Sequence, residues 1–422
     1  MVAGMWLKLA SVCGLLVFLG LAWALSEKRR LFPWRTVVWG LALQVAFALL
    51  ILRTGAGRAV FDFTGAAINR LVRFSDAGCK FVFGPLGDGA VLGRVFGAEN
   101  AFVFAVTISG TIILVGALSS LFYHWGLLQK VVHGMAWVMR QVMGTSGSET
   151  LSAAANVFMG QTEAPLLIRP YIPRLTRSEM LAMMTGGMAT IGGGVAAVYV
   201  QMATAAGHPD FAGHLLTASV LNAPAGLLMA KIMIPETEAS ETAASAPAAV
   251  PRTTANAIDA LCRGAGDGLQ LALNVIGMLI AFVAVVELAN FLFTWAQAVA
   301  GVAHPATLQA VLGWANAPFA WLMGVPWQDC RAVGQVLGER IVLNEFFGYV
   351  SLNKATLDPR SYTIATYALC GFANFASIAI QVGGIGSLAP ERRGLMATLG
   401  VRAMVAGLLA CYVSACVAGI LL

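Results

Sequence analysis

The chain has 422 residues, of which 59% are apolar and 11% are charged, and its net charge is +6. Soluble globular proteins carry about 25% charged residues, so this composition excludes that class and indicates a polytopic membrane protein. The Lys and Arg residues flank apolar segments, and no basic groove with interleaved aromatic residues is visible, so we expect a lipid bilayer around the chain and no nucleic-acid partner.

Residues 9–25 form the first apolar run, and the cluster Lys28, Arg29 and Arg30 comes after it. A secretory signal peptide carries its positive charges before the apolar run. We therefore predict a retained transmembrane helix whose C-terminal end lies in the cytoplasm.

Further uncharged runs are long enough to span about 30 Å of hydrocarbon, and together with the first they predict eight crossings. The eight runs are 9–25, 36–52, 101–129, 180–207, 211–230, 268–286, 361–390 and 403–422. Between the second and third, residues 53–99 alternate apolar and charged side chains, which favours a helix lying in the membrane interface. We predict a short peripheral helix within 302–326, because His304-Pro305 and Pro318 interrupt that run.

The basic residues of the connections fall mostly on one side of the membrane when eight crossings are drawn. This distribution predicts that both termini lie outside a cytoplasmic, or inner, membrane. The exception is the connection 53–94, whose six basic residues would lie outside. The preference of basic residues for the cytoplasmic side is weaker in a long connection such as this one.

Two further segments, 141–168 and 327–354, are apolar but interrupted by polar residues, and each half is too short to cross. Both resemble re-entrant hairpins, which require protein or water to cover their broken backbone. Each is followed by a helix with a predicted break, around 189–194 in the first half of the chain and 371–377 in the second. The fold class predicted is therefore an all-α polytopic membrane protein with two re-entrant helical hairpins, discontinuous helices and an inverted repeat.

The hairpins place Glu163 and Glu345 within apolar surroundings, where a carboxylate is costly unless it has a function or a partner. Discontinuous helices that meet near the midplane are the design of secondary transporters. We expect the two acidic tips to meet around one ligand. Because carboxylates, amides and hydroxyls dominate there, the ligand would be a neutral polyhydroxyl or heterocyclic solute.

Simpler interpretations exist for each feature. Either acid could pair with a nearby arginine, Gly192 to Gly194 could serve close helix packing, and Asn156 and Thr190 could be interhelical hydrogen-bonding groups. An intramembrane enzyme using the two acids would need a nucleophile or a metal cluster, and a channel would need rings of like groups along a pore. The seven cysteines and five histidines show no metal-ligand spacing, so we expect neither an enzyme nor a metal or organic cofactor.

Three motifs carry a resemblance to a known family. They are GQTEAPLLIRPY from Gly160, NEF from Asn344 and CGFANFASI from Cys370. In this order and at these separations they resemble the signatures of the concentrative nucleoside transporter family, over the chain from 141 to its C-terminus. The length resembles the bacterial, eight-helix members.

The resemblance implies a homotrimer that imports nucleosides such as uridine, cytidine or adenosine by an elevator-like movement. The segment after 236 is small, polar and low in complexity, which indicates a flexible linker, and together with the resemblance it divides the chain into five parts. These are helices 1–140, mainly scaffold; a first transport repeat, 141–236; a flexible cytoplasmic linker, 237–255; a long scaffold helix and peripheral helix, 256–325; and a second transport repeat, 326–422.

Individual roles are also implied by the resemblance. The nucleobase-binding residues would be Gln161, Thr162, Glu163, Val195 and Phe372. The ribose-binding residues would be Glu345, Asn374 and Ser377. A sodium ion would be bound by Asn156, Thr190 and the carbonyls of Met159 and Ile191. Sodium is favoured as the coupling ion because both Asn156 and Thr190 are present, and proton coupling through Glu163 or Glu345 is the alternative.

Overall fold

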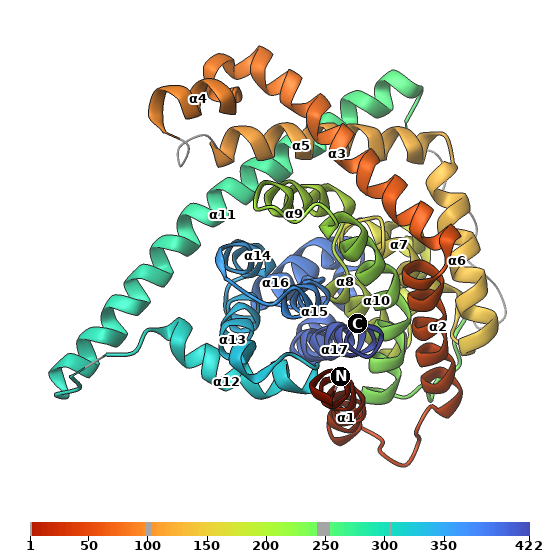
Figure 1. The fold of residues 1–422 in the computed structure, drawn as a ribbon. Helices are drawn as coiled ribbons and strands as arrows, with labels where there is room; N and C mark the ends of the chain where they lie inside the picture. The colour runs from red at the N-terminus through yellow and green to blue at the C-terminus, as the bar shows by residue number, and fades with distance from the viewer. Residues whose placement is uncertain (1, 98–102, 243–253, 304) are drawn as a thin grey trace.

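The chain is built from helices in the computed structural model, which describes residues 2–97, 103–242, 254–303 and 305–422 (Figure 1). No strand occurs within these ranges, in agreement with the predicted all-α class. Helices suit this sequence because a bilayer offers no water to backbone groups, which must form their hydrogen bonds within each segment.

Within the described residues, six α-helices and one 3₁₀ helix precede the first hairpin. They are α1 (Val2–Ala24), α2 (Trp34–Arg53), α3 (Gly55–Phe83), η1 (Gly84–Gly87), α4 (Gly89–Phe96), α5 (Phe104–His124) and α6 (Leu127–Met143). The first hairpin and the helices after it are α7 (Gly147–Asn156), η3 (Ala164–Arg174), α8 (Arg177–Ala189), α9 (Gly193–Ala205) and α10 (Phe211–Met233).

After one very long helix, the second half of the chain again contains a hairpin followed by an interrupted helix. Its elements are α11 (Ala257–Val299), α12 (Leu308–Leu322), α13 (Trp327–Val342), α14 (Glu345–Lys354), α15 (Pro359–Leu369), α16 (Phe375–Gly384), η4 (Ile385–Ser387), η5 (Pro390–Arg392) and α17 (Arg393–Leu421).

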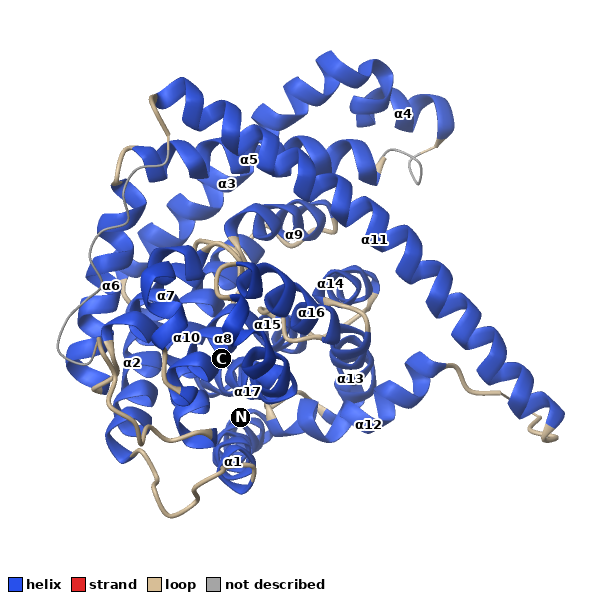
Figure 2. Cartoon of the chain, turned by 180° about the vertical axis from the view of Figure 1, so that it is seen from behind, coloured by secondary structure: helices blue, strands red, loops and turns tan. Residues whose placement is uncertain are grey.

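An outer layer is formed by α3, α5 and α11, and α11 runs along the outside of the molecule in both views (Figures 1 and 2). The helices α5 and α11 cross where glycines face each other. A Cβ atom at Gly264 would lie 2.4 Å from the carbonyl oxygen of Gly116, and one at Gly268 would lie 2.8 Å from the Cα of Ile113. Small residues therefore allow these two backbones to touch, as is common between membrane helices.

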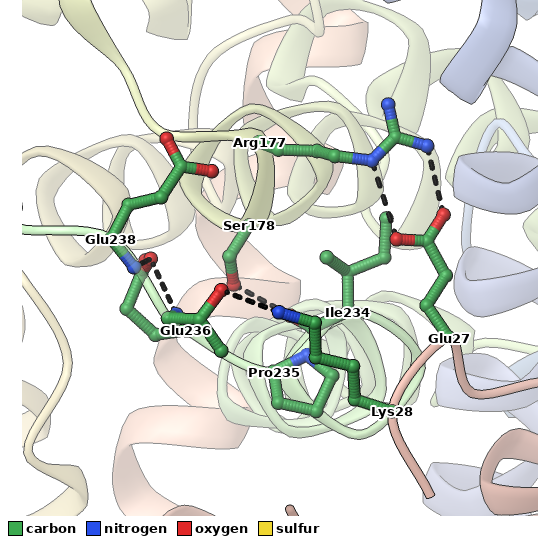
Figure 3. Close-up of a pocket in the computed structure, with 9 residues that line it drawn as sticks. Glu27, Lys28, Arg177, Ser178, Ile234, Pro235, Glu236 and Glu238 are labelled. Carbon is green, nitrogen blue, oxygen red and sulfur yellow. Dashed lines mark hydrogen bonds and ion pairs between the residues drawn. The ribbon is translucent and has the colours of Figure 1, made fainter.

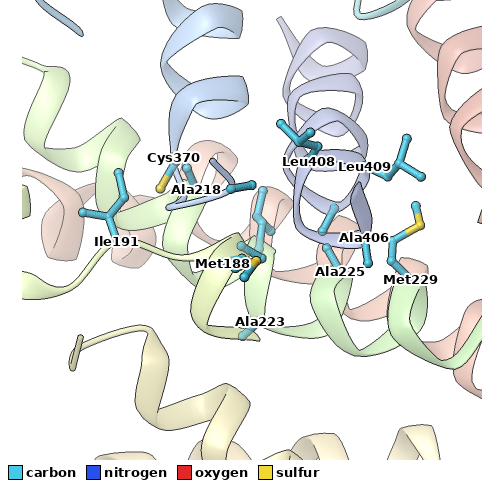
Figure 4. Packing of buried hydrophobic residues seen from close by; sticks show 14 of the residues in the cluster. Met188, Ile191, Ala218, Ala223, Ala225, Met229, Cys370, Ala406, Leu408 and Leu409 are labelled. Carbon is cyan, nitrogen blue, oxygen red and sulfur yellow. The ribbon is translucent and has the colours of Figure 1, made fainter. Parts of the chain in front are cut away.

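An inner body contains both hairpins and both interrupted helices, with α8, α10 and α17 packed against one another. Its core is rich in alanine and methionine, and Figure 4 shows Met188, Ala225, Met229 and Ala406 among these buried side chains. Small side chains bring the helices close together, so the elements that carry the polar tips rest on a densely packed support.

Five helical segments within the described ranges are long and apolar enough to cross a membrane. They are Gly4–Ala24, Trp34–Arg53, Ala105–His124, Phe211–Met233 and Pro390–Leu421. The other three predicted spans fall on α11 and on two interrupted pairs, α8 with α9 and α15 with α16. The predicted peripheral helix corresponds to α12, and the predicted interfacial segment contains α3 and α4.

Two packing observations concern segments of the predicted division of the chain. First, α1 packs against α17 and α2 packs against α10, so these helices belong to the inner body and not to the outer layer. Helix order along the chain does not reveal which helices touch.

Second, the first part of the predicted flexible linker is held in place. Thr242 is buried, its hydroxyl donates to Ser148 Oγ at 2.8 Å, and its carbonyl accepts from Gly147 N at 2.9 Å. Low sequence complexity did not reveal these contacts with the start of α7. Residues 243–253 of the predicted linker lie outside the described residues.

Candidate functional site

The first hairpin begins with α7, whose N-terminus has a capping box formed by Ser146 and Glu149. The helix ends at Asn156, and a turn leads into η3. Pro165, Pro170 and Pro173 lie in this second arm. Proline lacks an N–H group and clashes with the preceding helical turn, so this arm cannot be a regular α-helix.

The tip of this hairpin touches the interruption between α8 and α9. Thr190 ends α8 in an extended conformation, with φ −121° and ψ 166°. The Gly193 N–H donates to the Phe158 carbonyl at 3.1 Å. A Cβ atom at Gly192 would lie 2.9 Å from the Cα of Gly160, so glycine is required for this backbone contact. The break therefore supplies main-chain groups to the hairpin tip.

The second half builds its polar groups from two helix N-termini. Asn344 caps α14 by accepting from Phe347 N at 3.2 Å, and Glu345 is the first residue of that helix. Asn374 caps α16 by accepting from Ser377 N at 2.9 Å. Asn is a favoured capping residue because its side-chain oxygen satisfies a free helical N–H. These caps fix the position of each polar side chain.

A chain of hydrogen bonds joins the two halves. Gln161 Nε2 donates to Ser377 Oγ at 3.2 Å, and Asn374 Nδ2 donates to Glu345 Oε2 at 3.0 Å. The Asn374–Ser377 cap connects these two contacts. All four side chains are buried, with at most 8% of each residue exposed. The structure thus brings together four of the eight side chains predicted to bind substrate.

The other predicted substrate residues are not members of this chain of hydrogen bonds. Glu163 is exposed, and Glu163 Oε2 accepts from Gly160 N at 3.2 Å. Within the described residues no hydrogen bond links Glu163 to Glu345, whereas Gln161 of the same hairpin tip bonds to Ser377. Val195 and Phe372 are half-buried beside the two breaks, in α9 and between α15 and α16.

The predicted ion-binding residues converge at the first break. Asn156 is fully buried and donates through Nδ2 to the Ser152 carbonyl at 2.9 Å, but its Oδ1 has no hydrogen-bond partner in the described part of the chain. Both Asn156 and Thr190 lie next to Gly186, because the Thr190 hydroxyl donates to the Gly186 carbonyl at 2.9 Å and a Cβ at Gly186 would lie 3.3 Å from Asn156 Nδ2.

Met159 and Ile191 complete the predicted set, and both lie outside regular helix. Each precedes one of the two glycines, Gly160 and Gly192, whose backbones touch. A buried amide oxygen without a partner, a hydroxyl and non-helical carbonyls are oxygen donors of the kind that hard cations prefer. The residues therefore fit the predicted cation by their chemistry and their proximity.

Two residues of this region were not predicted from the sequence. The Tyr199 hydroxyl donates to Glu345 Oε1 at 2.8 Å, and Gln381 Nε2 donates to Gln161 Oε1 at 3.1 Å. No sequence signal marks Tyr199, which lies within an apolar run. Gln381 follows Ser377 by one helical turn, and this i, i+4 spacing could have indicated it.

A charged pocket lies elsewhere, where α8 begins and α10 ends (Figure 3). Arg177 Nη2 lies 2.8 Å from Glu27 Oε1, and Arg402 also pairs with Glu27. Lys28 Nζ donates to Thr237 Oγ1 at 3.1 Å. None of the predicted site residues lines this pocket, and its ion pairs link the connection after α1 to the inner body.

Comparison with protein families matches most of the chain. Residues 13–86 match the model described as "Na+ dependent nucleoside transporter N-terminus", and residues 214–419 match its C-terminal counterpart. Residues 105–206 match a model described as "Nucleoside recognition".

Individual relatives agree with these matches. The chain is 40% identical to an uncharacterized transporter of Haemophilus influenzae, over 98% of this chain and 97% of the relative. It is 36% identical to the sodium/nucleoside cotransporter 1 of Mus musculus, over 98% of this chain and 64% of that longer protein.

Solved structures match over nearly the whole length. The structure of CNTnw in an inward-facing substrate-bound state has a TM-score of 0.90 and 37% identity, covering 98% of this chain and 97% of that one. A variant of CNTnw in an outward-facing state has a TM-score of 0.91 and 37% identity, covering 99% and 98%. The fold therefore matches both states equally well.

Proposed function

We propose a site and a coupling mechanism for this chain, which belongs to the concentrative, Na+ dependent nucleoside transporter family. The chain is accordingly a membrane transporter of nucleosides and not an enzyme. The proposal concerns which residues bind the nucleoside, which ion drives its import and which helices move.

The nucleoside binds between the two halves of the inner body. Glu345, Asn374 and Ser377 bind the ribose hydroxyls. The base contacts Gln161, Thr162, Glu163, Val195 and Phe372. The observation that carries this proposal is the buried chain of hydrogen bonds from Gln161 to Glu345, because a neutral ligand rich in hydroxyl and amide groups can exchange into it without leaving a charge unpaired.

Sodium is cotransported through a site at the first break, formed by Asn156, Thr190 and the carbonyls of Met159 and Ile191. Asn156 Oδ1 is buried and has no hydrogen-bond partner among the residues that the structure describes, which supports this choice because such an oxygen is costly unless a ligand uses it. Sodium binding joins α7 to the break and so fixes the hairpin tip that carries Gln161. Nucleoside and sodium must then raise each other's affinity by the same factor.

Movement follows the division between layers. The outer helices α3, α5 and α11 form the scaffold, and the inner body, which includes α1 and α2 because of their packing, moves as the transport domain. We place both termini outside the inner membrane, from the distribution of basic residues, and expect a homotrimer from the family resemblance.

Nucleoside uptake into proteoliposomes tests this proposal. An inward sodium gradient should drive the accumulation of uridine above its external concentration, whereas an inward proton gradient in choline should not. Accumulation driven by protons alone would replace sodium with the alternative coupling ion. Uptake that equilibrates without accumulation under either gradient would contradict coupled transport.

A further inference from the structure

Gln381 lies behind the hairpin tip, fully buried on α16. The residues Ser377, Gln381 and Gly384 are spaced at i, i+4 and i+7, so they share one face of this helix. All three meet the hairpin tip: Ser377 and Gln381 contact Gln161, and a Cβ at Gly384 would lie 2.9 Å from Thr162 Cγ2. One helix face therefore supports the tip that carries the proposed base-binding side chains.

The orientation of the Gln381 carboxamide is set by the backbone. Gln381 Nε2 donates to the Met184 carbonyl at 3.0 Å, and a backbone carbonyl can only accept. Turning the amide over would place Gln381 Oε1 against that carbonyl oxygen. In the observed orientation, Gln381 Oε1 has no hydrogen-bond partner in the described part of the chain. The flipped orientation would place two carbonyl oxygens against each other, which costs more free energy than one unpaired oxygen. The NH₂ group of Gln381 is thus fixed toward both Met184 and Gln161.

The fixed orientation of the Gln381 carboxamide determines the orientation of the Gln161 carboxamide. Gln381 Nε2 uses one hydrogen on Met184 and offers the other to Gln161 Oε1, at 3.1 Å. The oxygen of Gln161 must then face Gln381, and its NH₂ group must face the opposite side, where one hydrogen reaches Ser377 Oγ at 3.2 Å. Ser377 is the one acceptor of this NH₂ group among the described residues, so its second hydrogen is available to a ligand.

We propose that Gln381 is a positioning residue that holds Gln161 with its NH₂ group toward the substrate, so that the site selects nucleobases presenting a hydrogen-bond acceptor there. This inference rests on the proposed role of Gln161 in base binding. It adds a residue and a direction to the recognition of the base: the protein donates and the base accepts.

The space around this pair shows how closely it is built. A Cβ at Gly187 would lie 2.7 Å from Gln381 Nε2 and 3.0 Å from the Cβ of Gln161. Glycine at this position is what lets the two amides lie side by side against α8. Substitution of Gly187 therefore offers a second way to disturb the pair that leaves both amides chemically intact.

The test measures equilibrium binding of nucleoside analogues to the purified transporter in sodium. Uridine is compared with zebularine, which lacks the C4 oxygen, and with 2-thiouridine, which has a weaker acceptor at C2. The base ratio is the Kd of the analogue divided by the Kd of uridine. Gln161→Ala first identifies the analogue whose base ratio falls when Gln161 is removed. Gln381→Met should then lower the same ratio by about fivefold or more, and the Gln161→Ala/Gln381→Met double variant should lower it no further than Gln161→Ala alone.

Two controls separate positioning from general damage. Gln381→Met should leave the ratio of Kd values for uridine and 3′-deoxyuridine unchanged, since this ratio reports the ribose contacts. Gln44→Met makes the same chemical change at another fully buried glutamine, whose amide forms no hydrogen bond within the described residues, and it should leave both ratios unchanged.

Each outcome decides between the claims. If Gln161→Ala lowers a base ratio and Gln381→Met does not, the inference is overturned while the base site stands. If Gln161→Ala changes no ratio, the base-binding assignment fails and takes the inference with it. If the Gln381→Met protein does not fold, Gly187→Ala must produce the same loss of base discrimination, and unchanged discrimination in that variant would overturn the inference.

Discussion

The two carboxylates at the hairpin tips occupy corresponding places in the two halves of the chain, yet their surroundings differ. Glu345 is buried and accepts from the Tyr199 hydroxyl at 2.8 Å and from Asn374 Nδ2 at 3.0 Å. Glu163 is exposed and accepts from Gly160 N at 3.2 Å, within its own turn. One acid is held by other helices and the other by its neighbour in sequence.

The polar groups of the two breaks differ in the same way. In the second half, Asn374 uses its oxygen on a helix cap and its nitrogen on Glu345. In the first half, Asn156 Oδ1 is buried without a partner in the described residues. The polar groups at the second break are therefore held in place by protein side chains, whereas the first break has a buried oxygen that a bound ion would pair. In the proposed mechanism, ion binding would therefore act on the first half of the site.

The largest effect is expected from breaking the second half of the site. Glu345→Gln removes a charged acceptor from Tyr199 and Asn374, and hydrogen bonds to charged groups contribute about 1.5–3 kcal/mol. Uridine affinity should fall by roughly 10- to 150-fold in equilibrium binding. Binding of 3′-deoxyuridine, which lacks one ribose hydroxyl, should fall less. Equal losses for both ligands would place Glu345 away from the ribose.

A smaller effect is expected from the ion side of the first half. Thr190→Val removes a hydroxyl but keeps the shape of the side chain, so the sodium concentration that half-saturates uridine binding should rise by about tenfold. Thr366→Val is the matched control, because Thr366 is equally buried and its hydroxyl also donates to the carbonyl four residues before, at 2.9 Å. A similar shift in both variants would argue against an ion site at Thr190.

The smallest effect is expected from loosening Glu345 without removing it. Tyr199→Phe deletes one of the two side-chain donors to Glu345 but keeps the carboxylate and its contact with Asn374, so only part of the contribution of Glu345 should be lost from binding, and uridine affinity should fall by roughly 2- to 10-fold. Tyr349→Phe serves as the control. Its ring lies 4.5 Å from that of Tyr199, and its hydroxyl donates to the Thr366 carbonyl instead. If the Tyr199→Phe and Tyr349→Phe variants bind uridine with the same affinity, Tyr199 does not position Glu345.

Much of this arrangement follows from local sequence. The breaks were predicted from glycines and from polar residues within apolar runs, and the structure interrupts the helices at Thr190 and before Asn374. Such breaks are local because a helix ends where glycine, proline or a capping side chain competes with its hydrogen bonds. The grouping of α1 and α2 with the inner body was not predicted, since it depends on which helices pack together.

The amino-acid sequence was enough to predict a chain embedded in a membrane, two broken helices, and acids and amides at those breaks. These properties follow from apolar run length and from residues that interrupt helices. The contacts of Gln161 with Gln381 and Ser377, and of Tyr199 with Glu345, came to light in the folded chain. Contacts between residues distant along the chain depend on how helices cross, and no local pattern encodes that geometry.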